Sequence, residues 1–193
     1  PTGALYSRAE LAALAEVFKQ HPQVFIMSDE IYEHINFTGK HESIAQFDFL
    51  KDRTIVINGF SKGYAMTGWR LGYIAAPVEI AKACDKVQGQ FTSGANSIAQ
   101  RAGIVALLGD QAPTYEMTEK FHQRRDKVMA LLSEIPNIKC DTPPAAFYVF
   151  PDVSAYFGKS TPAGETIANA DDLCMYLLNT AHVSVVTGKA FGE

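Results

Sequence analysis

Residues 53–73, "RTIVINGFSKGYAMTGWRLGY", read as strand, loop and strand in one continuous run. The β-branched first part, within residues 53–60, is typical of a short buried strand in a parallel sheet. Glycines, aromatic residues and two isolated cations fill the loop that follows. Residues 70–77, closed by Pro77, predict the next strand. This run therefore predicts a sheet whose strand ends carry polar loops.

Helical and strand patterns alternate along the rest of the chain. Residues 24–32 predict another short buried strand that ends in acidic residues. Helices are predicted at residues 7–21, 78–91, 96–110 and 112–136. The first of these carries a start signal, because Ser7 is followed three residues later by Glu10, as in a capping box. This alternation is typical of the α/β fold class.

The sequence pattern changes near residue 112. Beyond the long helix, residues 138–154 suggest two strands around a proline-rich turn, and residues 169–188 suggest a helix followed by a strand. We therefore expect two domains. Residues 1–111 would belong to a large domain with a mainly parallel sheet flanked by helices, and residues 112–193 to a smaller, incomplete α/β domain. Both ends look cut, so we expect a segment of a longer polypeptide.

Composition excludes several classes of function. The net charge is −4, with 17 basic and 21 acidic residues and no basic stripe, so we expect no nucleic-acid partner. No apolar run approaches the roughly 20 residues of a membrane helix, so we expect no membrane partner. The three cysteines form no CxxC pair and the five histidines no HExxH motif, so no metal site is expected and the reducing cytoplasm is favoured.

Five chemically distinct side chains are predicted to gather at one edge of the sheet. Asp29 and Tyr32 follow the first strand, Ser61 and Lys62 follow the second, and Arg70 lies just before the third. Ligands of open parallel sheets bind beyond the carboxyl ends of the strands. Pyridoxal 5′-phosphate matches this set, because its aldehyde takes an amine, its ring nitrogen a carboxylate, its phenolic oxygen a donor, and its phosphate an arginine.

The motifs that carry these residues point to a family. "SDEIYEHI" (28–35) followed by "NGFSKGYAMTGWRLGY" (58–73) resembles the class I/II aminotransferases of the fold-type I pyridoxal-phosphate enzymes, in particular their bacterial aspartate or aromatic branch. Four further stretches resemble segments of that family: "PTG" (1–3), "SIAQ" (97–100), "AAFYVFPD" (145–152) and "VSVVTGKAFG" (183–192). The resemblance covers most of the chain and implies a segment from the C-terminal half of such an enzyme.

The resemblance assigns a role to each of the five side chains. Lys62 would hold the cofactor as a Schiff base and carry a proton during the reaction. Asp29 would pair with the pyridine nitrogen and favour its protonated form. Tyr32 would donate its hydroxyl to the cofactor's phenolic oxygen. Arg70 would bind the phosphate through two hydrogen bonds, with Ser61 adding a hydroxyl.

Two other positions follow from the same resemblance, and a third follows from strand geometry. Phe191 lies where the family's C-terminal loop approaches the substrate, and it is a candidate wall of the substrate site. Glu30 should point away from Asp29, because neighbouring residues of an extended chain face opposite sides. Gly59 stands where the family often has a second phosphate-binding serine, so that donor is missing or is replaced by backbone.

The resemblance implies a cytoplasmic homodimer that moves an amino group from an amino acid, with aspartate favoured, to a 2-oxo acid such as 2-oxoglutarate. Two other readings stay open. A β C–S lyase or an aminocyclopropane-carboxylate synthase type of enzyme would use the same lysine. A transcription regulator would keep the pyridoxal-phosphate-binding domain and bind DNA through a separate upstream domain. The family's carboxylate-binding arginine would lie shortly after Glu193, outside the present sequence.

Overall fold

The computed structural model describes residues 1–192 and divides them into two compact units. The sheet unit comprises residues 4–122 with the short segment 144–146. The C-terminal unit comprises residues 1–3, 123–143 and 147 onward. The long helix α4 (Ala112–Ser133) contributes its first half to the sheet unit and its second half to the C-terminal unit.

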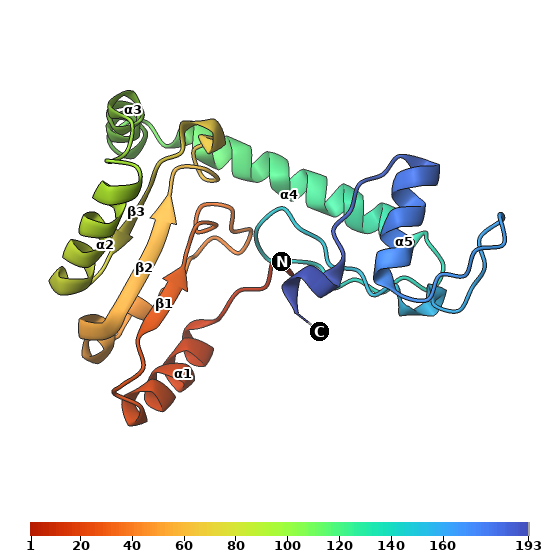
Figure 1. Ribbon diagram of the computed structural model, residues 1–193, viewed down its shortest axis with the longest axis horizontal. Helices are drawn as coiled ribbons and strands as arrows, with labels where there is room; N and C mark the ends of the chain where they lie inside the picture. The colour runs from red at the N-terminus through yellow and green to blue at the C-terminus, as the bar shows by residue number, and fades with distance from the viewer. Residues whose placement is uncertain (193) are drawn as a thin grey trace. The chain divides into compact units, whose positions relative to one another are not determined.

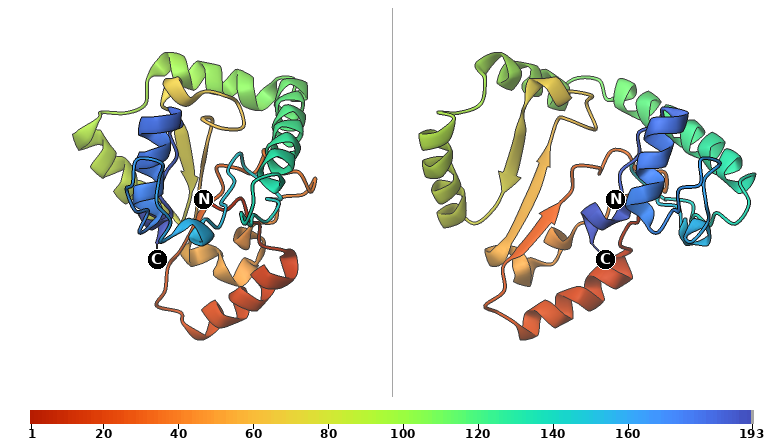
Figure 2. Two further views of the ribbon diagram at one scale, coloured as in Figure 1. Left: turned by 90° about the vertical axis from the view of Figure 1, so that its right-hand side faces the viewer. Right: turned by 45° about the vertical axis from the view of Figure 1, so that its right-hand side comes forward.

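The sheet unit is built on three strands in the order β1 (Ile26–Asp29), β2 (Thr54–Gly59) and β3 (Gly72–Ala75) (Figure 1). Helices accompany the sheet, so the predicted α/β class is confirmed. The strands β1 and β2 are parallel, as expected, and β3 runs antiparallel to β2 (Figure 2). Parallel neighbours need a long crossover, usually a helix, whereas the loop between β2 and β3 holds only a single 3₁₀ turn, η3 (Thr67–Trp69).

Helix α1 (Arg8–Gln20) is closed at both ends by side chains. The predicted capping box is confirmed, because the Ser7 hydroxyl accepts from the Glu10 amide at 3.3 Å and the Glu10 carboxylate accepts from the Ser7 amide at 2.8 Å. At the other end, the Arg53 guanidinium donates to the carbonyl of Phe18 and to two carbonyls just beyond the helix, at distances of 2.6–2.9 Å. A cation there also favours the negative end of the helix dipole. These bonds tie α1 to the start of β2.

The core of the sheet unit lies between α1, β1 and two short 3₁₀ turns, η1 (Ile44–Gln46) and η2 (Asp48–Arg53). Its buried members are Leu11, Ala15, Ile26, Ile44 and Leu50. Fully burying an aliphatic side chain of the larger kind stabilises a fold by about 1.5–3 kcal/mol, so this cluster firmly anchors the segment between β1 and β2.

Two further helices complete the sheet unit. Helix α2 (Val78–Phe91) follows β3, and helix α3 (Ser97–Leu108) begins at Asn96, whose side chain accepts from two amides of its first turn. Gly103 of α3 lies against the β2–β3 loop, since a Cβ placed there would be 2.8 Å from the Leu71 side chain. The missing side chain therefore lets α3 pack closely on the loop that carries the candidate site.

The C-terminal unit contains less regular structure than the sequence predicts. The helix expected from residue 169 is confirmed as α5 (Ala170–Tyr176), which continues into a π-helical turn, η5 (Leu177–Ala181). The strands predicted within residues 138–154 are wrong, because that segment forms isolated bridges instead, one between Lys139 and Asp152 and one from Ala145 to Asn36.

The strand predicted at the end of residues 169–188 is also wrong. A β-branched run becomes a strand only when a neighbouring strand satisfies its amides and carbonyls. Within residues 1–192, the segment 183–187 has no such neighbour, and it is followed by a 3₁₀ turn, η6 (Gly188–Phe191). None of the helices in this described range is both long and apolar enough to cross a membrane.

Candidate active site

The first part of the site is the turn beyond β1. Asp29, the last residue of β1, pairs with Ile57 of β2, and the next amide, that of Glu30, donates to the Ile57 carbonyl at 2.8 Å. Two hydrogen bonds then close consecutive turns, from the Glu33 amide to the Glu30 carbonyl and from the Ile35 amide to the Tyr32 carbonyl, each at 2.9 Å. Tyr32 is thereby held, half-buried, directly beyond the strand end.

Asp29 and Glu30 have opposite environments. Asp29 is exposed, and one carboxylate oxygen accepts from the Ile31 amide at 3.2 Å. It forms no ion pair with any residue in the range 1–192. Glu30, in contrast, is only 8% exposed. Its carboxylate is hydrogen-bonded to Ser28, His41 and Ser43, away from Asp29. The prediction that Glu30 points away from Asp29 is confirmed.

The second part of the site is the turn beyond β2. The Phe60 amide donates to the Leu71 carbonyl at 3.3 Å, and the Phe60 carbonyl accepts from the Met66 amide at 3.2 Å. These bonds close a compact loop between β2 and β3. Its first turn is completed by the Ala65 amide, which donates to the Lys62 carbonyl at 3.2 Å. Ser61 and Lys62 lie on this turn and are half-buried.

The two turns touch each other at Gly63. A Cβ placed on Gly63 would lie 2.5 Å from a ring carbon of His34, so only glycine fits without displacing the histidine. The His34 ring also meets the Tyr64 ring edge-on, with centroids 5.2 Å apart. This contact brings the turn that holds Tyr32 against the turn that holds Lys62.

Arg70 lies on the same loop as Lys62, just before β3. Its backbone is left-handed, with φ 51° and ψ 52°, and ends the 3₁₀ turn η3. One guanidinium nitrogen donates to the Thr67 carbonyl at 2.9 Å. The exposed side chain lines a groove of about 640 Å³ that also includes Gly94 and Asn96. The structure thus brings five of the predicted side chains to one edge of the sheet, while their roles stay predictions.

Phe191 belongs to the C-terminal unit, whereas the five side chains above belong to the sheet unit. It is 56% exposed, and its ring meets the Phe150 ring edge-on with centroids 6.5 Å apart. Its assignment as a wall of the substrate site stays a prediction.

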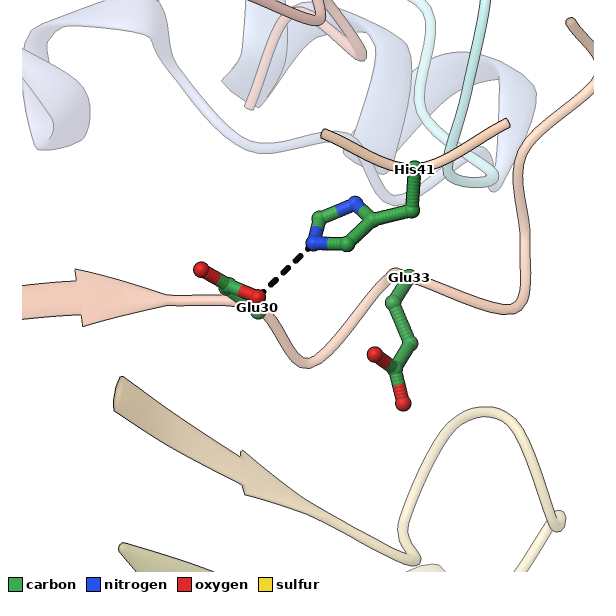
Figure 3. A group of neighbouring side chains, drawn as sticks. All are labelled: Glu30, Glu33 and His41. Carbon is green, nitrogen blue, oxygen red and sulfur yellow. Dashed lines mark hydrogen bonds and ion pairs between the residues drawn. The ribbon is translucent and has the colours of Figure 1, made fainter. Parts of the chain in front are cut away.

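A buried ion-pair network beneath the site was missed by sequence reasoning. The Glu30 carboxylate accepts hydrogen bonds from the hydroxyls of Ser28 (3.0 Å) and Ser43 (2.6 Å), and it pairs with the His41 ring at 2.8 Å (Figure 3). His41 and Ser43 lie 11 and 13 residues further along, in a loop without periodicity. The sequence pattern of the acidic residues after β1 does not predict that Glu30 pairs with His41 and Ser43.

The pKa values of Glu30 and His41 are shifted in opposite directions. Burial by itself raises the pKa of Glu30, but hydrogen bonds from His41, Ser43 and Ser28 outweigh it, so the pKa lies below its ordinary value. The hydrogen bond to Glu30 raises the pKa of His41. The Glu33 carboxylate lies near both groups, within 4.8 Å (Figure 3). Its pKa is lowered mainly by a hydrogen bond from His34. Both pKa shifts favour the charged form of the Glu30–His41 pair.

Replacing His41 with glutamine is expected to destabilise the fold in a pH-dependent way. Because the pKa of His41 is raised above 6.5, its contribution is complete below about pH 6.5 and is lost as the pH rises through the raised value. Because the pKa of Glu30 is lowered, its contribution is present above about pH 4.5 and is lost only as the pH falls through the lowered value. We expect a loss of about 1–3 kcal/mol in unfolding free energy at pH 6 and a smaller loss at pH 9.

Urea unfolding at both pH values measures this difference. His21→Gln is the control, because the His21 side chain is exposed and lies outside the network. Equal losses at pH 6 and pH 9 for His41→Gln would contradict the charged pair.

Gly59 is another position where the structure explains the sequence. A Cβ on Gly59 would lie 2.9 Å from the Cα of its cross-strand partner Gly72 and 3.0 Å from the Leu71 carbonyl oxygen. The backbone cannot move away easily, so Gly59→Ser is expected to lower stability by about 1–3 kcal/mol. The measurement is the urea midpoint. Gly68→Ser is the matched control, because nothing lies within 4 Å of its Cβ position, and equal losses for both variants would contradict the close approach.

Comparison with known proteins places this geometry in a family. The family model described as "Aminotransferase class I and II" matches residues 1–193. A bifunctional aspartate aminotransferase and glutamate/aspartate-prephenate aminotransferase from Petunia hybrida is 45% identical over 199 residues, covering 100% of this chain and 41% of the relative. An aspartate/prephenate aminotransferase from Cereibacter sphaeroides is 46% identical over 201 residues, covering 100% and 48%.

The fold comparison agrees with the sequence comparison. The crystal structure of the aspartate aminotransferase from Rhizobium meliloti superposes with a TM-score of 0.95 at 47% identity, covering 100% of this chain and 49% of that one. The chain spans about half the length of the relatives that it matches. With the family model covering every residue and the fold of a solved member reproduced throughout, the chain belongs to the class I and II aminotransferase family.

Proposed function

We propose that the protein transfers an amino group between aspartate and a 2-oxo acid such as 2-oxoglutarate, with pyridoxal 5′-phosphate bound through Lys62. The observation that carries this proposal is the contact between the two turns at Gly63, because it joins the turn of Tyr32 to the turn of Lys62 at the edge where Asp29 ends β1. The relatives named for aspartate support the choice of substrate.

The donor set at this edge fits the cofactor. A primary amine, a phenol and a hydroxyl lie on two touching turns, and a guanidinium lies on the same loop as the amine. The Asp29 carboxylate is exposed and forms no ion pair within the described range, so it is available to a cationic ring nitrogen. Together these groups match the functional groups around the pyridoxal phosphate ring.

Each side chain then has one task. When bound, the cofactor supplies an electron sink for the bond that breaks at the substrate's α-carbon. The Lys62 amine removes the proton from that carbon and delivers it to the C4′ carbon of the cofactor. The Asp29 carboxylate stabilises a positive charge at the ring nitrogen, and the Tyr32 hydroxyl donates to the phenolic oxygen. Arg70 and Ser61 orient the whole group through its phosphate.

Two half-reactions on the full-length protein test this function. Added aspartate should yield one oxaloacetate per cofactor, and added 2-oxoglutarate should then yield glutamate and restore the original visible spectrum. Because two relatives are named for prephenate as well as aspartate, prephenate is tested as a second acceptor. Release of pyruvate and ammonia from a sulfur-containing amino acid, without amino transfer, would overturn the proposal in favour of a lyase.

The assembly and the compartment are part of the same proposal. The family resemblance supports a homodimer in the cytoplasm whose ligands are an amino acid and a 2-oxo acid. Cross-linking and light scattering of the full-length protein test the dimer, and a monomer with full activity would contradict it.

A further inference from the structure

The network beneath the site connects the end of β1 to the hydrophobic core. The Ser43 hydroxyl donates to Glu30 and also accepts from the Ala45 amide at 3.1 Å, so it caps the short turn η1. The next residue, Ile44, is 5% exposed and packs in the core cluster with Leu11. A continuous chain of contacts therefore runs from α1 through η1 to the carboxylate of Glu30.

The direction of the Asp29 side chain depends on this anchor. Asp29 is the last residue of a strand only four residues long, and its side-chain hydrogen bond within residues 1–192 is local, to the Ile31 amide. Its orientation is therefore set by the backbone around residue 30. That backbone is held on one side by the Glu30 amide, which bonds to Ile57, and on the other by the Glu30 carboxylate.

We propose that Glu30 is a positioning residue for Asp29: by tying the end of β1 to His41 and Ser43, its carboxylate fixes where the Asp29 carboxylate points. This inference rests on the proposed function, because it takes Asp29 as the partner of the cofactor's ring nitrogen. Glu30 itself touches neither cofactor nor substrate, since it faces the opposite side of the strand. Residues that orient a ligand-binding side chain from behind commonly change affinity or activity by about 10–100-fold.

The first experiment needs no cofactor. Amide hydrogen exchange, followed by mass spectrometry on the full-length protein without cofactor, reports how firmly residues 29–35 are held. In Glu30→Gln, peptides over this segment are expected to exchange at least about tenfold faster than in the wild type, with peptides over α1 unchanged. The glutamine keeps the size and an acceptor oxygen but loses the charged pair with His41.

The control variant is Glu42→Gln. Glu42 lies beside His41 and forms ion pairs with Lys40 and Arg8, so the substitution removes a carboxylate of the same loop without touching the end of β1. Exchange of residues 29–35 in this variant should match the wild type. Unchanged exchange in Glu30→Gln, or equal acceleration in both variants, would overturn the inference whether or not the protein is an aminotransferase.

The second experiment uses the protein loaded with cofactor labelled with ¹⁵N in the ring. In Glu30→Gln the ring-nitrogen resonance should move toward that of the unprotonated form. The cofactor dissociation constant should rise about 3–30-fold. The value of kcat should fall by a larger factor than the factor by which the KM for aspartate changes. In Glu30→Ala each effect should be larger. Glu30→Gln should therefore retain part of the function that Glu30→Ala loses. A wild-type resonance and dissociation constant in a folded Glu30→Ala protein would show that Glu30 has a structural role alone.

The two proposals fail in different ways. If the wild-type protein binds the cofactor at Lys62 but transfers no amino group, the proposed function fails, while the ring-nitrogen shift still tests Glu30. If Glu30→Ala does not fold, Glu30→Gln and the exchange measurement decide the question. If amino transfer is normal and the exchange and resonance are unchanged in both Glu30 variants, the positioning role fails and the proposed function stands.

Discussion

Replacing Lys62 with alanine is expected to lower amino-group transfer by at least about 1000-fold, because in the proposed function this one side chain supplies both the covalent attachment and the proton carrier. The turn that carries Lys62 is closed by backbone hydrogen bonds and by the fit of Gly63 against His34. The alanine should therefore leave the fold intact and remove the chemistry alone. Loss of the attached cofactor's visible absorbance should accompany the loss of rate.

Borohydride reduction followed by peptide mapping measures the attachment directly. In the wild type, the reduced cofactor should be found on the peptide that contains Lys62, and Lys62→Ala should carry none. Lys51→Ala is the control, because Lys51 is an exposed lysine paired with Asp48 on the surface. A reduced cofactor on any other lysine of the wild type, or full activity in Lys62→Ala, would contradict the assignment.

Replacing Asp29 with asparagine has the second-largest expected effect. The amide keeps the size of the side chain and its acceptor for the Ile31 amide. It no longer carries the charge that, in the proposed function, stabilises a protonated ring nitrogen. Removing one preorganised electrostatic partner of a reacting group commonly lowers kcat by about 100–1000-fold, and we expect a loss in that range. The exposed position of Asp29 predicts little change in the stability of the unliganded protein.

Single-turnover kinetics with aspartate measure this loss without interference from product release. Asp48→Asn is the matched control, since Asp48 is an exposed aspartate on η2, away from the strand ends. Restoration of rate in Asp29→Asn by a cofactor analogue with a permanently charged, N-methylated ring would support the role in charge stabilisation. A rate within threefold of the wild type would remove Asp29 from the reaction.

The sequence predicted the parts of the sheet unit that depend on local patterns. The β-branched runs before Asp29 and Lys62 became β1 and β2, and the Ser7–Glu10 box started α1. Parallel strands bring their carboxyl ends to one edge, so the sequence alone predicts that the candidate residues of these two motifs lie together.

The sequence failed where structure depends on partners far along the chain. Residues 183–187 have the composition of a strand, yet they lack a hydrogen-bonded neighbour within residues 1–192. The Glu30 network was missed for a related reason, because its partners His41 and Ser43 come from an irregular loop that carries no periodic signal. Pairing across such a loop is a property of the folded chain and leaves no local pattern.

The contact at Gly63 has a consequence for the redesign of this site. Because Gly63 has no Cβ, the turn that carries Lys62 packs directly against the His34 ring, so packing sets the relative placement of the two turns. Libraries aimed at new substrates should therefore hold positions 34 and 63 constant and diversify elsewhere, because even an alanine at 63 would displace the His34 ring.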